Sequence, residues 1–221
     1  FCMGNQLFRP KRLRYEEIWE IAEEFRKEHL ADIAEIPVPI EEIVEFKLHI
    51  EIVPQISLKT SSDIEAFLSN DLKSIYVDSS IYFDDRYLQR LRFTLAHEIG
   101  HYVMHKDVIR ALHFNGYEDW SEFIKNTKEE DIEWFERQAF EFAGRLMVPK
   151  EYLVNLIRPL KTEIEEYAEK LKKEAEFDMD YLLTGVARKI CSHFNISADV
   201  VKIRIRKEKI FDILDINLYT S

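Results

Sequence analysis

Two histidines four residues apart, with a glutamate directly after the first, are the residues of this chain best suited to chemistry: His97, Glu98 and His101. On a helix, positions i and i+4 lie one turn apart on one face, so both imidazoles can reach a single metal ion. Glu98 lies beside that face and can contact a water on the metal without binding the metal itself. Two neutral nitrogens, a carboxylate from elsewhere and an exchangeable water make a catalytic zinc site. The spacing therefore predicts hydrolytic zinc chemistry.

The helix that must present these residues is visible in its apolar positions, which recur at steps of three and four. They are Leu88, Leu91, Leu95, Ile99, Tyr102 and Val103. Asp84 and Asp85 precede them as the expected N-cap and first-turn acid. Gly100 lies inside the helix, where glycine costs about 1 kcal/mol relative to alanine. We expect Gly100 to allow the close approach of another backbone, or of a substrate, to the metal.

Two histidines alone hold zinc poorly, so a third protein ligand is needed. A third histidine six residues after His101 is absent, because that position is Asp107. The remaining choice is a carboxylate from a downstream helix, which the apolar spacing predicts over residues 130–147.

Glu136 is the favoured third ligand on that downstream helix. The neighbouring turns carry small residues that would let the two helices approach closely, namely Ala139, Ala143 and Gly144. Glu133 and Glu141 fit by spacing alone and remain rivals.

A donor is also needed for the oxyanion of the reaction, and four side chains are candidates: Tyr102, His105, His113 and Tyr117. His105 could instead orient a ligand or cap the helix.

The N-terminal part alternates between predicted helices and strands. Helices are expected over residues 15–34, broken by Pro37 and Pro39, and over residues 40–46. Strands are expected over residues 48–53 (ended by Pro54), 64–68 and 74–77, the last two joined by the turn Ser69-Asn70-Asp71. The pattern predicts an α+β fold, with a small, partly antiparallel sheet packed on helices that include the metal-binding helix.

The chain after His105 is expected to be irregular as far as the helix over residues 130–147, with a turn at Asn115-Gly116. Beyond Pro149 the pattern is all-helical, with helices near residues 150–157, 162–176 and 180–194 and another after Ser197. The sequence thus predicts a metal-site core over residues 11–150 and a helical C-terminal extension over residues 151–221. The apolar tail 210–219 could be a strand, a dimer contact or a partner site.

Residues 181–209 resemble a helix-turn-helix, with Ser197 as N-cap of the second helix. A basic cluster follows, made of Lys202, Arg204, Arg206, Lys207 and Lys209. A DNA-binding regulatory protein that uses the metal site as a sensor is therefore the alternative function. Residues 201–206 also alternate, so a local strand is a second interpretation there.

The composition argues against membranes and nucleic acid as binding partners. Of the 221 residues, 46% are hydrophobic and 33% are charged, and no apolar stretch reaches the roughly 18 residues of a membrane span. A net charge of −11 disfavours attraction to nucleic acid or acidic membranes, so direct nucleic-acid binding is the less favoured interpretation. Two cysteines and no signal-peptide pattern near the start predict a cytoplasmic protein without a disulfide framework.

The segment from Arg92 to His105 resembles the core of the ImmA/IrrE family of zinc metallopeptidases. The run from Glu136 to Pro149 resembles the second signature of that family, except that Phe140 replaces its usual asparagine. The resemblance implies His97, His101 and Glu136 as metal ligands and Glu98 as catalytic acid/base. It extends more weakly over about residues 15–210.

The resemblance implies a zinc-dependent endopeptidase, in which Glu98 acts as general base toward a zinc-bound water. The implied partner is a protein substrate, a helix-turn-helix transcriptional repressor. We expect such a substrate to add as a strand beside Ser74 to Val77, because this predicted strand directly precedes the metal-binding helix.

Overall fold

The structure is a computed structural model, and it describes residues 8, 10–30, 35–62, 64–112, 117–174 and 177–218. The chain divides into two compact units. The first contains Phe1–His29 and Pro39–Ala143, and the second contains Leu30–Val38 and Gly144–Ser221. The sequence predicts a boundary at residues 150–151, whereas the division in the structure falls inside helix α8 (Glu129–Met147).

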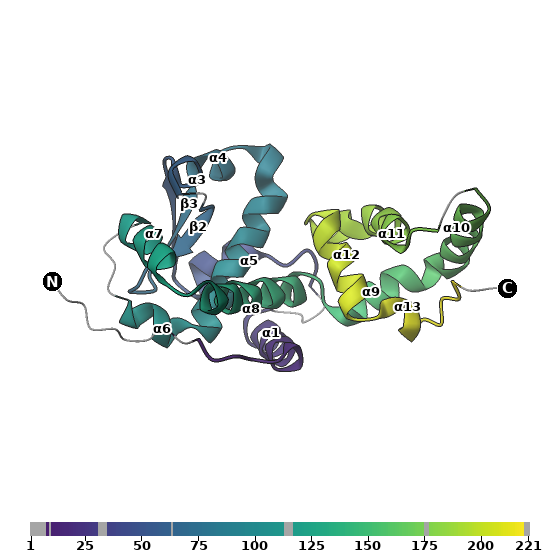
Figure 1. Ribbon diagram of the computed structural model, residues 1–221, viewed down its shortest axis with the longest axis horizontal. Helices are drawn as coiled ribbons and strands as arrows, with labels where there is room; N and C mark the ends of the chain where they lie inside the picture. Colours follow the sequence, from purple (N-terminus) through teal and green to yellow (C-terminus); the bar gives the residue numbers. More distant parts are fainter. Residues whose placement is uncertain are drawn as a thin grey trace. The chain divides into compact units, whose positions relative to one another are not determined.

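The first unit contains a small sheet and helices around it (Figure 1). Its strands are β1 (Glu51–Gln55), β2 (Ala66–Leu68) and β3 (Ser74–Asp78). Its helical elements are α1 (Tyr15–His29), α2 (Ile40–Glu42), a π-helical turn (Ile43–Lys47), α3 (Leu58–Ser62), α4 (Ser79–Tyr82), a 3-10 turn (Asp85–Tyr87), α5 (Leu88–Met104), α6 (Lys106–Ala111), α7 (Tyr117–Asn126) and most of α8. The expected α+β class is confirmed.

The sheet has the strand order β1-β3-β2, with β3 parallel to β1 and antiparallel to β2. The predicted turn at residues 69–71 does join β2 to β3. Because β3 is the central strand and has a partner on each side, the expectation that a substrate pairs beside Ser74 to Val77 is wrong. In this sheet β2 is paired on one side only.

Two N-terminal predictions also need correction. The first helix ends at His29 rather than at residue 34, and residues 31–34 lie outside the described part of the chain. The first strand runs over Glu51–Gln55, so Pro54 lies within it instead of ending it. Proline is tolerated there because β1 is an edge strand. A residue whose nitrogen faces away from the sheet needs no N–H group for the ladder.

The segment after His105 is more ordered than its sequence suggested. It forms α6 and α7, while the expected turn at Asn115-Gly116 lies outside the described residues. Asp84 is an N-cap as predicted, but its side chain accepts from the Arg86 amide at the start of the 3-10 turn that leads into α5. The helix predicted over residues 130–147 is confirmed as α8.

Helix α5 carries the metal motif and packs against α8 through Gly100. A Cβ atom at this position would lie 3.0 Å from the Ala139 Cα atom and 3.1 Å from the Ala139 carbonyl oxygen. The expected close approach of another backbone is therefore confirmed, and Ala139 supplies it. Gly144 has a different neighbour, because its free space is filled by the Arg204 side chain of the second unit, at 3.1 Å.

The regular secondary structure among the described residues of the second unit is all helical. Its elements are α9 (Lys150–Ile157), a 3-10 turn (Arg158–Leu160), α10 (Lys161–Glu174), α11 (Met179–Phe194), α12 (Ala198–Lys207) and α13 (Ile210–Ile213). Asn195 has the left-handed conformation, and Ser197 caps α12 by accepting from the Val200 amide. The pair of helices predicted at residues 181–209 is thus present, and the strand interpretation of residues 201–206 is wrong.

The predicted basic cluster on α12 is largely paired within the second unit. Arg204 is buried and forms an ion pair with Glu208, which also pairs with Arg145. Lys202 and Arg206 both contact Asp180 on α11. The cluster therefore joins helices to one another.

The apolar tail is packed inside the second unit rather than extended. Ile216 and Leu218 are buried, the Asn217 amide donates to Glu165 on α10, and the Lys161 ammonium donates to the Leu214 carbonyl. Residues 210–213 form α13, so a strand is excluded for them. Among the described residues, no helix combines the length and hydrophobicity that crossing a bilayer requires.

Candidate metal centre

The candidate site is formed where α8 crosses α5. Helix α5 presents His97 and His101 one turn apart, and α8 presents Glu136 opposite them. The three side chains each direct one potential ligand atom into a common space, with all three atoms within 4.8 Å of one another. Among the described residues, no other group of three His, Cys, Asp or Glu side chains has ligand atoms this close together.

The donor atoms lie close enough together to share one zinc ion, although the two histidines approach different carboxylate oxygens of Glu136. His97 Nε2 lies 3.0 Å from His101 Nε2 and 3.0 Å from Glu136 Oε2, and His101 Nε2 lies 3.7 Å from Glu136 Oε1. Ligands about 2.05 Å from a tetrahedral ion are about 3.3 Å apart, a value inside the observed range. Two imidazole nitrogens and one carboxylate also form a typical zinc donor set, so these residues fit the ion.

The charges at the site favour an ionised carboxylate. Burial raises the pKa of Glu136, but hydrogen bonds and positive charge from His101 and His97 outweigh burial and hold that pKa well below its usual range. For His97, burial lowers the pKa, but the hydrogen bond and charge of Glu136 and the charge of Glu98 outweigh burial, so the pKa is raised above its usual value. The Glu136 side chain is 35% exposed, compared with 10% for His97, so the site opens to solvent on the Glu136 side.

Glu98 has the opposite environment. The residue is buried, and burial is the largest cause that raises its pKa. The charges of His101 and His97 act against this rise, Glu136 adds to it, and a backbone hydrogen bond from Leu68 on strand β2 opposes it. The backbone of β2 thus reaches the second residue of the motif.

His105 and Phe135 support the histidine pair from the buried side. His105 Nδ1 lies 3.0 Å from His101 Nδ1, and His105 Nε2 has no hydrogen-bond partner among the described residues. Burial, followed by the charge of His101, lowers the pKa of His105 to about 2, so the ring is neutral. Phe135 stacks on His105 and packs on His101 with ring centroids 4.1 Å apart. The ring of His101 is therefore held on two sides.

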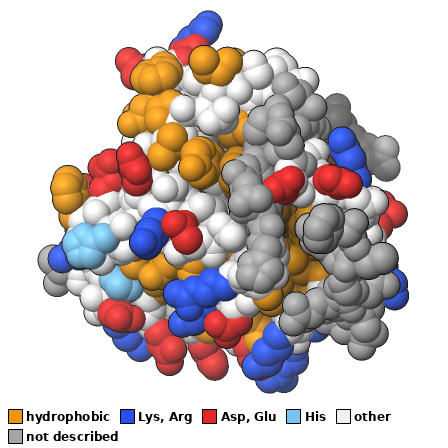
Figure 2. Space-filling model, turned by 90° about the vertical axis from the view of Figure 1, so that its left-hand side faces the viewer, with side chains coloured by type: hydrophobic (Ala, Val, Ile, Leu, Met, Phe, Trp, Pro, Cys, Tyr) orange, Lys and Arg blue, Asp and Glu red, His pale blue; other side chains and the backbone are white. Residues whose placement is uncertain are grey.

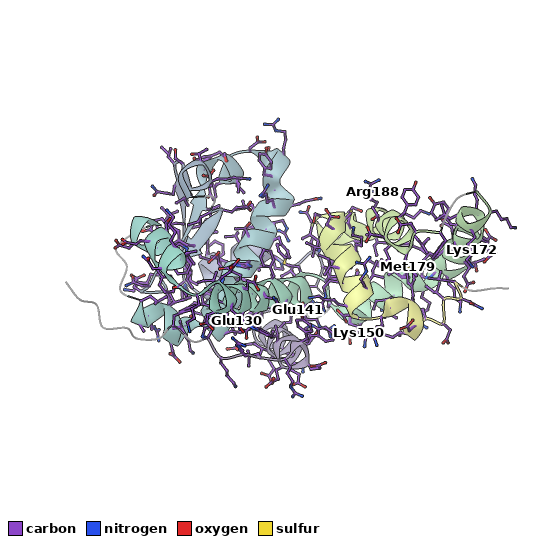
Figure 3. All side chains as sticks on the ribbon, viewed as in Figure 1. Glu130, Glu141, Lys150, Lys172, Met179 and Arg188 are labelled. Atoms are coloured by element: carbon purple, nitrogen blue, oxygen red, sulfur yellow. The ribbon has the colours of Figure 1, made fainter. Side chains whose placement is uncertain are left out.

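The rival carboxylates have other partners. Glu133 is exposed and contacts Arg137, one turn further along α8. Glu141 is buried and accepts a hydrogen bond of 2.6 Å from Trp19 Nε1 on α1. Figure 3 labels Glu141 and Glu130 on α8, on either side of position 136. Of the three acids, the structure brings Glu136 to the histidines.

Of the four side chains expected as oxyanion donors, His105 is the one that a described hydrogen bond places at the site, against His101. His113 and the side chain of Tyr117 lie outside the described residues. Tyr102 is half-buried on α5.

Sequence reasoning missed three contributors to the site. Leu68 acts through its backbone, which has no sequence signal. Phe135 contributes to the apolar spacing that predicts α8, and that spacing carries no signal of a contact with the histidines. Phe140, noted as a departure from the family signature, packs edge-on against His97 with ring centroids 4.5 Å apart.

A family model described as the IrrE N-terminal-like domain, of the M78 peptidases, matches residues 81–206, more than half of the chain. The chain belongs to the ImmA/IrrE family. No curated protein shows significant similarity to it. The matched residues of this ImmA/IrrE member include α5 with its histidine pair, α8 with Glu136, and the second unit as far as α12. The family is one of metallopeptidases, and the site has a His-His-Glu triad that could hold a metal ion.

Proposed function

We propose that this protein is a zinc-dependent endopeptidase that cleaves a protein substrate. The observation that carries the proposal is the convergence of His97, His101 and Glu136 on one space, with the buried carboxyl of Glu98 next to them. A zinc site that served only as a structural support would need no such acid beside its ligands.

His97 and His101 would bind zinc through their Nε2 atoms, and Glu136 through its carboxylate. When bound, zinc acts as a Lewis acid that polarises the scissile carbonyl and makes water more acidic. The chain itself must then hold the substrate and transfer protons.

Glu98 is proposed as the residue that transfers the proton. Its carboxylate takes a proton from the attacking water while the water oxygen bonds to the carbonyl carbon. As the carbon–nitrogen bond breaks, Glu98 gives that proton to the leaving amine, which restores the carboxylate. Burial raises the pKa of Glu98, and a raised pKa suits a group that must both accept and release a proton.

His105 is proposed to position His101. A neutral histidine that binds a metal through Nε2 carries its proton on Nδ1, where it can donate to a neighbouring acceptor. His105 Nδ1, 3.0 Å away, is that acceptor. This assignment places the His105 proton on Nε2 and fixes the orientation of the His101 ring.

The proposed substrate is a helix-turn-helix transcriptional repressor, the class that resemblance to the family implies. An extended segment of it would pair beside β2, whose outer edge has no strand partner in the described sheet. The support for this position is that β2 packs against α5, the helix that carries Glu98, and that the Leu68 backbone is among the groups that influence the pKa of Glu98.

The test is to incubate the zinc-loaded protein with repressors encoded beside its gene, and to compare it with Glu98→Gln. We expect the variant to bind zinc as the wild type does, and its rate of cleavage to be about 10²- to 10⁴-fold lower, because proton transfer is lost. Glu133→Gln is the matched control, since Glu133 is exposed and contacts Arg137. Equal cleavage by wild type and Glu98→Gln would refute the assigned role.

A further inference from the structure

One large aromatic residue is exposed in an otherwise buried stretch of α8. From Gln138 to Met147 every residue of this helix is buried except Phe140, which is 54% exposed. A phenylalanine so placed contributes little to the core, because more than half of its surface remains in water. Its position, next to the metal centre, therefore needs a separate explanation.

Phe140 lies on the side from which solvent reaches the site. It is one helical turn after Glu136, the most exposed of the three proposed ligands, and its ring packs edge-on against His97. On α5, one turn before His97, the half-buried ring of Phe93 lies 5.9 Å from that of Phe140 at a tilt of 31°. The two aromatic rings thus form an apolar wall beside the triad.

We propose that Phe140, backed by Phe93, is a specificity residue that contacts an aromatic or large aliphatic side chain of the peptide substrate. The inference rests on the proposed peptidase function. Phe140 follows Glu136 by four residues, an offset of about 6 Å along the helix. An extended peptide rises about 3.3 Å per residue, so the side chain that reaches Phe140 belongs to a residue within two positions of the cleaved bond.

The nearby charges agree with an apolar ligand. Arg137, one turn before Phe140 on α8, contacts the carboxylate of Glu133. A polar or charged substrate side chain would lose hydration against the two rings without gaining a partner from them. An apolar one removes water from exposed aromatic surface, which is favourable.

The first experiment profiles cleavage of a library of acetylated and amidated peptides with randomised sequence, with the products read by mass spectrometry. Zinc-loaded wild type should favour Phe, Tyr, Trp, Leu or Met over Ser by about 10-fold at one position within two residues of the cut. Phe140→Ala should lose the preference and Phe140→Leu should keep most of it. Phe83→Ala removes a ring that is 73% exposed and precedes α5, so it should leave the preference unchanged.

The second experiment needs no turnover. Immobilised, zinc-loaded Glu98→Gln protein should retain library peptides enriched in the same apolar residues, and the double variant Glu98→Gln/Phe140→Ala should not. Retention without apolar bias, or a bias unchanged in the double variant, overturns the inference. If wild type cleaves in a Glu98-dependent manner without apolar preference, the inference fails while the peptidase function stands. Cleavage of repressors that does not depend on Glu98 overturns the proposed mechanism instead.

Discussion

Two glutamates of the site show how environment shifts the pKa of one residue type in opposite directions. For Glu136, hydrogen bonds and charge from two histidines overcome burial and lower the pKa, which keeps a carboxylate available for a cation. For Glu98, burial dominates and raises the pKa. Opposite shifts of this kind suit the proposed roles of Glu98 as acid/base and of Glu136 as ligand. The same reasoning applies to His105, whose neutral ring faces a proposed ligand.

At the residue scale, we predict that His105→Leu weakens zinc binding about 10- to 100-fold, because the acceptor for His101 Nδ1 is lost. His105→Asn should recover part of the affinity, since its side-chain oxygen can lie near the position of Nδ1. The measurement is the zinc dissociation constant from competition with a chelator, on variants whose circular dichroism matches wild type. Equal dissociation constants for His105→Leu and wild type would mean that His105 is not a positioning residue.

The packing of two helices creates the candidate metal centre, because its three side chains meet only where α5 and α8 come close. Gly100 on α5 and Ala139 on α8 provide this contact, and Phe142 of α8 would lie 3.2 Å from a Cβ at position 100. Helix α8 is also fixed from its other side, where Trp19 donates to Glu141 and Phe25 packs edge-to-face on Phe142. The position of Glu136 therefore depends on three helices.

At the element scale, Gly100→Ala should destabilise the first unit by up to about 2 kcal/mol. Contact with the rigid Ala139 backbone costs about 1–3 kcal/mol and is only partly offset by about 1 kcal/mol of helix propensity. The displaced helices should also bind zinc more weakly. Thermal unfolding and zinc titration measure both effects.

Gly185→Ala is the matched control for that change. Its added Cβ would meet Tyr167 Cε1 at 3.9 Å, an ordinary contact, so alanine should stabilise α11 by about 1 kcal/mol. Zinc binding should be unaffected. If both substitutions raised stability equally, close packing of α5 on α8 could not be the reason for Gly100.

For the molecule as a whole, the question is whether the second unit binds DNA in a sequence-specific way. Its paired helices α11 and α12 resemble a helix-turn-helix, but Arg204 is buried against Glu208, and Asp180 contacts both Lys202 and Arg206. The net charge is −11. The face drawn in Figure 2 is on the side of α6 and α7, in the first unit, and acidic and basic side chains are interspersed there with hydrophobic ones. Cations that already have acidic partners release fewer counterions from a DNA backbone.

At this scale, we predict that the full-length protein shows no sequence-selective DNA binding at about 150 mM salt in a filter-binding assay. Asp180→Asn, which frees Lys202 and Arg206, should increase any non-specific binding at low salt. Selective, steeply salt-dependent binding by the wild type would instead support the regulatory alternative.

Much of the site could be predicted because its signals are local in the chain. The i, i+4 histidines, the apolar spacing of α5 and α8, and the glycine at a close helix crossing all follow from helical geometry. The α+β class and the helical C-terminal part could be predicted for the same reason, and both are confirmed. Pro54 within an edge strand and the early end of α1 were missed, because their outcome depends on neighbours distant in sequence.

The sequence by itself determined the motif, the helices that carry it and the family of the chain. Only the tertiary structure showed that Glu136, the acid favoured from the sequence, faces the histidines, that β3 is central, and that the basic cluster of α12 is paired with acids of its own unit. Helical periodicity fixes which side chains share a face, whereas the partner of that face is set by packing between segments far apart in the chain.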